Sequence, residues 1–286
     1  MTISKFKDLP NLGFGIGGRP EHFKELIDSS PNIDWLEVIS ENFLIEGRKS
    51  TYYLEQLCEK YTVIPHGVSL SIGSTDPMKP EYLKMLKGLI DKMNPPWFSD
   101  HLCWTSHSGH NMHNLLPLPY TEETAQYIIE KIKQLQDMME RPFILENVSS
   151  YLEFESSMMT EWDFINMIIE GADCGVLLDV NNVYVSSQNH NFDPMDFIHA
   201  MPKERVVQYH IAGHTHKGPY LFDTHGAPIC DEVWELFTKT VPLFGDVPVL
   251  IERDEDIPSL DDMVNELDYA RKLYHESKAT VATPSA

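Results

Sequence analysis

Short apolar segments alternate with longer amphipathic segments along almost the whole chain, and this alternation constrains the fold more than any other feature. Most of the short segments are apolar at consecutive positions, as in strands that are buried on both faces. The segments that we expect to be strands are Leu12–Gly17, Trp35–Ile39, Thr62–Ser69, Trp97–Trp104, Pro142–Asn147, Gly175–Val180, Val206–Ala212 and Val247–Arg253.

The longer segments carry apolar residues at helical spacing, as Phe23, Leu26 and Ile27 do in the first of them. In the clearest segment, Thr121 precedes two glutamates and can cap the start of the helix. The helices that we expect are Pro20–Ser29, Tyr52–Lys60, Glu81–Met93, Thr121–Glu140, Trp162–Gly171, Pro194–Met201, Glu232–Val241 and Leu260–His275.

Eight alternations of strand and helix predict a closed (β/α)₈ barrel, a TIM barrel, and an open doubly wound sheet is the alternative. The 286 residues, 42% of them hydrophobic, suffice for one such core. No linker rich in Pro, Gly or Ser divides the sequence. We therefore expect a single metal-dependent catalytic domain over residues 1–276. Residues 277–286 are small and polar and predict a disordered C-terminal tail.

The charge balance excludes several classes of partner. The net charge is -22, with 44 acidic against 22 basic residues. Nucleic acids and anionic membranes are bound through Lys and Arg, so neither is expected as a partner. The four cysteines form no C-x-x-C pair, which argues against a thiolate zinc site and favours reduced thiols. The chain has neither a signal-peptide pattern nor an apolar run of ~20 residues, so we expect a soluble cytoplasmic protein.

Potential metal ligands stand near the ends of the predicted strands, where barrel enzymes place their chemistry. A carboxylate that follows apolar strand residues is costly to bury unless its charge is compensated. Imidazole and carboxylate donors suit iron, manganese or zinc, and one carboxylate can bridge two metals. A single histidine of this kind is more often a core residue, but the whole set predicts bound cations. The set is His66, His101, Glu146, Asp179, Asn182, His210, Asp223, His225 and Glu252.

A further segment, His107-Ser-Gly-His110-Asn-Met-His113, holds three histidines at three-residue spacing. Such a segment could recruit metal. We expect it to be a polar surface loop outside the site.

The spacing His210…Asp223-Thr-His225 resembles the metal pattern of endonuclease IV-type barrels. The order of the other donors also runs parallel to that pattern. Asn182 departs from it, because the nuclease pattern has histidine there. The acidic charge also argues against a DNA substrate.

A closer resemblance extends from about residue 10 to residue 275. It is carried by the stretches GFGIGGR, WLEVISENF, HGVSLSIGS, FSDHLCW, LLPLPYT, ILENVSSY, LLDVNNVYVSS, HIAGH, DTHGAPI and LIERD. These are similar to the multinuclear non-haem iron-dependent oxidative enzymes, a family that includes the catalytic subunit of methanobactin biosynthesis. Asn182 fits this family. The resemblance implies a TIM barrel that holds two or three irons and modifies ribosomally made peptides, commonly at cysteine.

By position, the resemblance implies three iron sites of mixed ferrous and ferric state, with O₂ as cosubstrate. One site would use His66, His101 and a bridging Glu146. A second would use Glu146, Asp179, His210 and Glu252. A third, more labile site would use Asn182, Asp223 and His225, because a neutral amide is a weaker ligand than an imidazole or a carboxylate.

Four further residues are candidates for catalytic or supporting roles around these metals, since metal-bound histidines usually donate their second N–H to a neighbouring acceptor. They are Asp100, Asn147, His214 and Arg253. The expected partners are a precursor peptide and a separate protein that recognises it, with recognition by the barrel loops as the alternative.

Three other functions compete with peptide oxidation. A dimetal sugar isomerase or epimerase uses similar donors, and a zinc phosphoesterase of the endonuclease IV type is a second alternative. Metal storage or scaffolding without catalysis is a third. The identity of the bound metal separates these functions. Iron favours the oxidase, whereas manganese, magnesium or cobalt favours an isomerase and zinc favours the nuclease.

Overall fold

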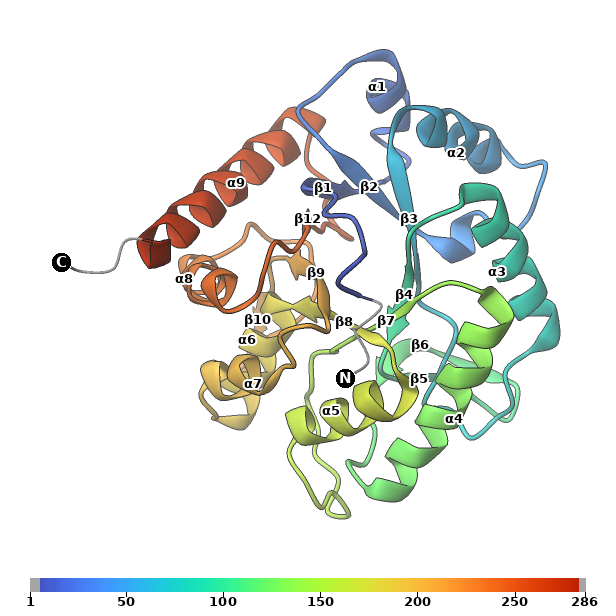
Figure 1. Cartoon of the computed structure of the whole chain (residues 1–286), viewed down its shortest axis with the longest axis vertical. Coiled ribbons are helices and arrows are strands. Elements are labelled where there is room, and N and C mark those ends of the chain that lie inside the picture. Colours follow the sequence, from blue (N-terminus) through green and yellow to red (C-terminus); the bar gives the residue numbers. More distant parts are fainter. Residues whose placement is uncertain (1–5, 283–286) are drawn as a thin grey trace.

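A closed barrel of eight parallel strands forms the centre of the computed structural model, which describes residues 6–282 (Figure 1). The barrel strands are β1 (Phe14–Gly17), β2 (Trp35–Ile39), β3 (Thr62–Gly67), β4 (Phe98–His101), β7 (Phe143–Glu146), β8 (Gly175–Asp179), β9 (Val206–Ile211) and β12 (Val249–Ile251). They close in the order β1-β12-β9-β8-β7-β4-β3-β2. The predicted TIM barrel is therefore confirmed.

Helices surround the barrel on its outer side (Figure 1). Those that the sequence predicts are α1 (Phe23–Asp28), α2 (Lys49–Lys60), α3 (Pro80–Met93), α4 (Glu122–Met139), α5 (Glu161–Ala172), α7 (Pro194–Ala200), α8 (Asp231–Thr240) and α9 (Leu260–Ala282). Thr121 caps α4 as expected, since its Oγ1 accepts the backbone N–H of Thr124 at 3.2 Å. Helix α9 continues to Ala282, into the segment predicted to be disordered, and residues 283–286 of that segment lie outside the described residues.

Helix α6 (Val180–His190) is an element that the sequence pattern did not predict. Its residues are mainly β-branched, Ser or Asn, which are weak helix formers. The side chain of Asp179 caps the helix, because one of its oxygens accepts the backbone N–H of Asn182 at 2.6 Å. A residue predicted as a metal ligand thus also starts the helix that follows its strand.

Two β-hairpins follow barrel strands and were also not predicted. The first comprises β5 (Trp104–His107) and β6 (His110–Leu116), and the second comprises β10 (Thr215–Lys217) and β11 (Tyr220–Phe222). In the first, His107 pairs with His110 across a turn whose two central residues have positive φ. Such a turn matches the twist of a tight hairpin.

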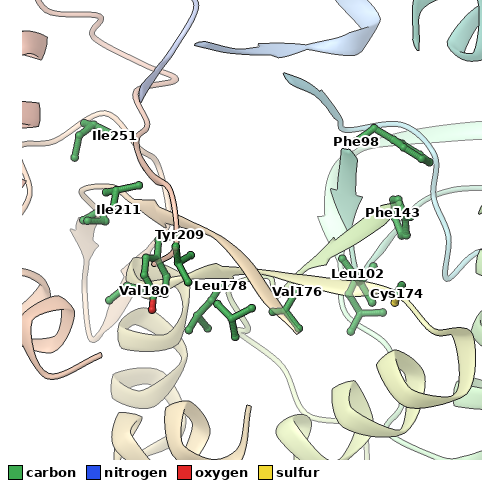
Figure 2. Close-up of a cluster of buried hydrophobic side chains, with 14 of the residues drawn as sticks. Phe98, Leu102, Phe143, Cys174, Val176, Leu178, Val180, Tyr209, Ile211 and Ile251 are labelled. Carbon is green, nitrogen blue, oxygen red and sulfur yellow. The ribbon is translucent and has the colours of Figure 1, made fainter. Parts of the chain in front are cut away.

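Two apolar clusters stabilise the barrel. The larger lies between the strands and the surrounding helices, and Figure 2 shows a part of it that includes Phe98, Phe143 and Tyr209. The smaller, which we call the floor, lies inside the barrel, and Leu9 and Leu12 pack against it. Each fully buried side chain of this size contributes about 1.5–3 kcal/mol. The floor consists of Phe6, Trp35, Ile64, Trp97, Ile144, Leu177, Val207 and Leu250.

The floor also determines where the polar side chains lie. Because side chains alternate along a strand, a residue two places beyond an inward-facing one also faces inward. Leu177 of the floor is therefore followed on β8 by Asp179, one step nearer to the C-terminal end of the strand. The same step leads from Ile64 to His66, from Ile144 to Glu146 and from Leu250 to Glu252. Several strands thus place a potential metal ligand directly above the floor.

No helix within residues 6–282 combines the length and the apolar character that crossing a membrane requires.

Candidate metal centre

The first group of donors consists of His66, His101 and Glu146. The Nε2 atoms of the two histidines are 3.3 Å apart, and each lies 3.3 Å from Oε2 of Glu146. The other ring nitrogen of His101 lies 3.0 Å from the carbonyl oxygen of Gly67, and that of His66 lies 2.8 Å from the hydroxyl of Ser99. A carbonyl only accepts, so it holds the proton of His101 on Nδ1 and leaves Nε2 free to bind a metal.

The second group consists of Glu146, Asp179, His210 and Glu252, which are all buried. Nδ1 of His210 lies 2.9 Å from Oε2 of Glu252, 3.6 Å from Oε1 of Glu146 and 3.9 Å from Oδ2 of Asp179. Glu146 thus presents one oxygen to each of the first two groups. This is the geometry in which one carboxylate can bridge two metals.

The third group surrounds His225. Its Nε2 lies 2.5 Å from Oδ1 of Asp223, and its Nδ1 lies 3.3 Å from both Oε2 of Glu252 and Oδ2 of Asp254. Asn182 lines the same cavity as Asp223 and His225. The structure therefore brings the three predicted residues together and adds Asp254, which was not predicted.

The unsatisfied atoms of these side chains fit bound cations. Both oxygens of Glu146, Oδ2 of Asp179 and Oδ1 of Asn182 are buried and have no hydrogen-bond partner among the described residues. The same is true of Nδ1 of His210 and both ring nitrogens of His225, because the carboxylates close to them do not lie in the direction of a hydrogen bond. Buried polar atoms are nearly always paired, so this concentration requires an explanation. Imidazole, carboxylate and amide donors are those that iron, manganese and zinc accept.

The charges at the site lead to the same conclusion. Burial raises the pKa of Asp179 well above its usual value, and repulsion by Asp223 and Glu146 adds to the rise. Burial alone would lower the pKa of His210, but the carboxylates around it outweigh burial and raise that pKa well above its usual value. These groups therefore attract positive charge, which either protons or metal ions can supply.

A cavity of about 400 Å³ opens above the three groups. Its inner wall includes His66, His101, Asp223 and His225, and part of its outer wall belongs to the hairpin β5–β6. Asn111, His113, Asn114 and Leu115 of this hairpin line the cavity. The expectation that the three-histidine segment lies outside the site is therefore wrong for His113, although His107 and His110 do not line the cavity.

A bulge in β6 explains this placement. Trp104 pairs with Leu116 and Ser106 pairs with Asn111, so residues 112–115 stand opposite Thr105 alone. His113 adopts a φ of 51°. Bulges redirect side chains and occur frequently beside active sites.

A protein-family model described as "RiPP precursor modification enzyme MbnB/TglH/ChrH" matches residues 13–275. The chain belongs to this family. RiPPs are ribosomally synthesised and post-translationally modified peptides, so the resemblance predicted from sequence is confirmed at the level of the family.

Relatives of this MbnB/TglH/ChrH chain match nearly its whole length. The UPF0276 protein Anae109_1558 from Anaeromyxobacter sp. (strain Fw109-5) is 49% identical over 255 residues, which cover 89% of this chain and 90% of the relative. A UPF0276 protein from Caulobacter vibrioides (strain NA1000 / CB15N) is 48% identical over 272 residues, or 95% of each chain.

Solved structures with the same fold are much more distant in sequence. A D-tagatose 3-epimerase-like protein superposes with a TM-score of 0.61 at 14% identity, covering 94% of this chain and 99% of its own. The 3-keto-D-glucoside 4-epimerase YcjR from E. coli superposes with a TM-score of 0.57 at 11% identity, covering 91% of this chain and 99% of its own. At this distance the likeness establishes the barrel fold alone.

Two residues that sequence reasoning missed contact the predicted ligands of this MbnB/TglH/ChrH barrel. Glu37 is buried on β2, and its Oε1 lies 2.8 Å from Nε2 of His210. Burial raises the pKa of Glu37, and the hydrogen bonds with His210 and Gln208 oppose that rise. Arg19, also buried, contacts Asp254 and lies 3.4 Å from Glu252. The step from Trp35 to Glu37 matches the step from Leu177 to Asp179, and this pattern could have revealed Glu37.

Asn147 and Asp100 hold the backbone beside predicted ligands. Asn147 accepts the N–H of Asp179 at 2.9 Å and donates to its carbonyl oxygen at 3.0 Å, which fixes the end of β8. Asp100 accepts the N–H groups of His101 and Leu70 at 2.7 and 3.1 Å. Burial raises the pKa of Asp100 to about 7, and Glu41 adds to the rise.

The remaining two candidates lie farther from the donors. Nδ1 of His214 contacts Oδ1 of Asn181 at 2.8 Å, and Asn181 in turn donates to Asp223 at 2.8 Å. The guanidinium of Arg253 instead contacts both carboxylate oxygens of Glu266, at 2.7 and 2.8 Å. Arg253 thus joins the end of β12 to α9, whereas His214 reaches Asp223, a predicted ligand, through one intermediate side chain.

Proposed function

We propose that this protein is a multinuclear iron- and O₂-dependent enzyme that oxidises a ribosomally synthesised precursor peptide at a cysteine. The observation that supports it most is that Glu146 and Glu252 are shared among three adjoining donor groups, which lie at or beneath one cavity. Membership of a family of RiPP precursor modification enzymes supplies the class of substrate.

The proposed ligand sets follow the groups described above. His66, His101 and Glu146 would hold one iron, and Glu146, Asp179, His210 and Glu252 would hold a second. Asn182, Asp223 and His225 would hold a third. Bound iron would supply the redox chemistry and an open position for the substrate thiolate.

The protein itself would orient the peptide and exclude water. A cavity of about 400 Å³ is at the small end of ligand pockets. It therefore admits only a short part of a peptide, with the cysteine innermost. Asn111, Asn114 and His113 on the outer wall offer amide and imidazole groups to the peptide backbone beside that cysteine.

Within residues 6–282, the barrel and its surrounding helices leave no separate unit for peptide recognition. We propose that a second protein captures the rest of the precursor peptide. None of the four cysteines forms a disulfide bond within the described residues, and Cys103 and Cys174 are buried. Free thiols suit a reducing cytoplasm, where we place the reaction.

Anaerobic purification from iron-57-enriched cells, followed by elemental analysis and Mössbauer spectroscopy, tests the metal. We expect two or three irons per chain and a coupled ferrous/ferric signal. Stoichiometric zinc or manganese in a chain that cannot bind iron would rule the oxidase out and favour hydrolysis or isomerisation.

Mass spectrometry tests the reaction itself. Cysteine-containing precursor peptides, incubated with the iron-loaded protein, should change mass in air and stay unchanged under argon. The same peptides with serine in place of cysteine serve as the control. A change of mass that does not require oxygen would contradict the proposal.

A further inference from the structure

A chain of hydrogen bonds crosses the barrel interior beneath the metal centre. The indole Nε1 of Trp97 donates to Oε1 of Gln208 at 2.9 Å, and Nε2 of Gln208 donates to Oε2 of Glu37 at 2.6 Å. The other oxygen of Glu37 lies 2.8 Å from Nε2 of His210. All four residues are at most 3% exposed, so water does not compete for these contacts.

A shift in strand pairing makes room for this chain of hydrogen bonds. Val176 of β8 pairs with Val206 of β9, whereas the next residue, Leu177, pairs with Gln208. The extra residue, Val207, packs into the floor, and Gln208 still contacts groups inside the barrel. An irregularity of this kind changes the direction of neighbouring side chains.

The chain of hydrogen bonds has a fixed direction because an indole N–H can only donate. Trp97 therefore holds the amide oxygen of Gln208 toward itself and turns the amide nitrogen toward Glu37. Glu37 then accepts a hydrogen bond from Gln208 through one oxygen and from Nε2–H of His210 through the other. A proton on Nε2 leaves Nδ1 as the ring nitrogen of His210 that can bind a metal.

This explains a difference among the histidines. His66 and His101 direct Nε2 toward Glu146, but His210 directs Nδ1 toward the second group. We infer that Trp97, Gln208 and Glu37 are positioning residues that make His210 bind its metal through Nδ1. The inference rests on the metal centre of the proposed function, but not on the metal being iron or on the substrate being a peptide.

Nuclear magnetic resonance of the zinc-loaded protein, with nitrogen-15 in its histidines, tests the orientation directly. We expect His210 to show a metal-bound Nδ1 and a protonated Nε2. Gln208 Nε2 also lies 3.0 Å from His210 Nε2. If Gln208 donated its hydrogen there instead, the proton of His210 would stand on Nδ1, and that result would overturn the inference.

Zinc affinity, measured by competition with a chelator, tests the role of each member. With Gln208 held by Trp97, the amide of Glu37→Gln would turn its oxygen toward Gln208 and its nitrogen toward His210. His210 would then accept at Nε2 and carry its proton on Nδ1. We expect zinc binding at the second group to weaken by about 10- to 100-fold, as for other residues that orient metal ligands.

The double variant Glu37→Gln, Trp97→Phe separates this role from a merely structural one. Without the indole, Gln208 is free to turn over and accept from the new amide, so that His210 can donate through Nε2 again. Part of the lost affinity should therefore return. Trp35→Phe is the matched control, since Trp35 belongs to the same floor and its indole lies 3.4 Å from Gly13 O instead.

A double variant that binds zinc no better than Glu37→Gln would overturn the inference. Equal recovery of zinc affinity when Trp35→Phe is combined with Glu37→Gln would overturn it as well. If Glu37→Gln does not fold, the resonance measurement on the unaltered protein still decides the question. Failure of the proposed oxidase is recognised separately, because zinc binding requires neither oxygen nor peptide.

Discussion

Two adjacent layers of the barrel interior are equally buried but differ in what they contribute. The floor is apolar, and the layer above it carries the carboxylates and imidazoles of the candidate metal centre. Leu177 and Asp179 stand two residues apart on β8, and both are 0% exposed. Leu177 stabilises the fold by leaving water, whereas Asp179 gives up hydration that only a partner of positive charge can replace.

The comparison indicates that the floor provides the stability that the polar layer needs. A buried carboxylate costs several kcal/mol unless it is paired, and Glu146 and Asp179 both retain an oxygen without a hydrogen-bond partner among the described residues. Substitutions in the two layers should therefore act on different quantities, metal content in one and folding stability in the other.

Glu146→Gln should have the largest effect, because Glu146 faces both the first and the second group. We expect two metal ions to be lost together, and activity with them. The metal-free protein should be as stable as before or more stable, since a buried charge has been removed. Elemental analysis and thermal unfolding measure the two effects.

Glu161→Gln is the matched control for Glu146→Gln. Burial raises the pKa of Glu161 to about 8, and this glutamate lines a different cavity together with Tyr120. Its substitution should leave the metal content unchanged. Loss of a single metal ion in Glu146→Gln would exclude the bridging role.

Leu177→Ala should act in the opposite way. Removing a large side chain from the floor should lower the free energy of unfolding by about 2–5 kcal/mol, because a cavity remains where the side chain was. Metal stoichiometry should be retained below the unfolding temperature. Denaturant unfolding checks the first point and elemental analysis the second, and loss of metal from the folded variant would contradict the separation of the layers.

The alternation of side chains along each strand explains how much of the fold and of the candidate site could be predicted from the sequence. A period of two along each strand places His66, Glu146 and Asp179 inside the barrel, so the eight strands and the donors at their ends were predictable from local pattern. Glu37 obeys the same rule. It was missed because it lies in the middle of β2, deeper than the strand ends at which ligands were expected.

Features that depend on tertiary contacts were not predictable in this way. Helix α6 has weak intrinsic propensity and is capped by Asp179. Arg19 and Asp254 lie outside the regular strands, after β1 and β12. They meet only because these two strands become neighbours when the barrel closes. The position of His113 depends on a bulge whose size no periodicity reveals.

Acidification should distinguish the third group from the first. Burial alone would lower the pKa of His225, but Asp223 and Glu252 outweigh burial and raise that pKa well above its usual value. A metal must therefore displace a proton from His225, and it does so less readily as the pH falls. In the first group, Glu146 and Asp100 outweigh burial and also raise the pKa of His101, but burial and the neighbouring His101 hold the pKa of His66 well below its usual value. His66 is therefore neutral at neutral pH, and a metal ion can bind it without displacing a proton.

We therefore expect the third metal ion to dissociate at a higher pH than the first when the protein is acidified. Cobalt-loaded protein, followed by its visible absorption over a pH series, measures the order of loss. Simultaneous loss of all ions at one pH would show that the groups act as a single unit.

His113→Ala should have the smallest effect, because His113 lies on the outer wall of the cavity, in neither layer of the barrel. The metal content should stay unchanged, whereas the KM for a precursor peptide should rise a few-fold, the equivalent of about one hydrogen bond. His107→Ala is the matched control, since His107 belongs to the same hairpin and is directed toward Asp76, 3.8 Å away. An equal rise in both variants would mean that the hairpin acts through its overall position, with no direct contact from His113 to the peptide.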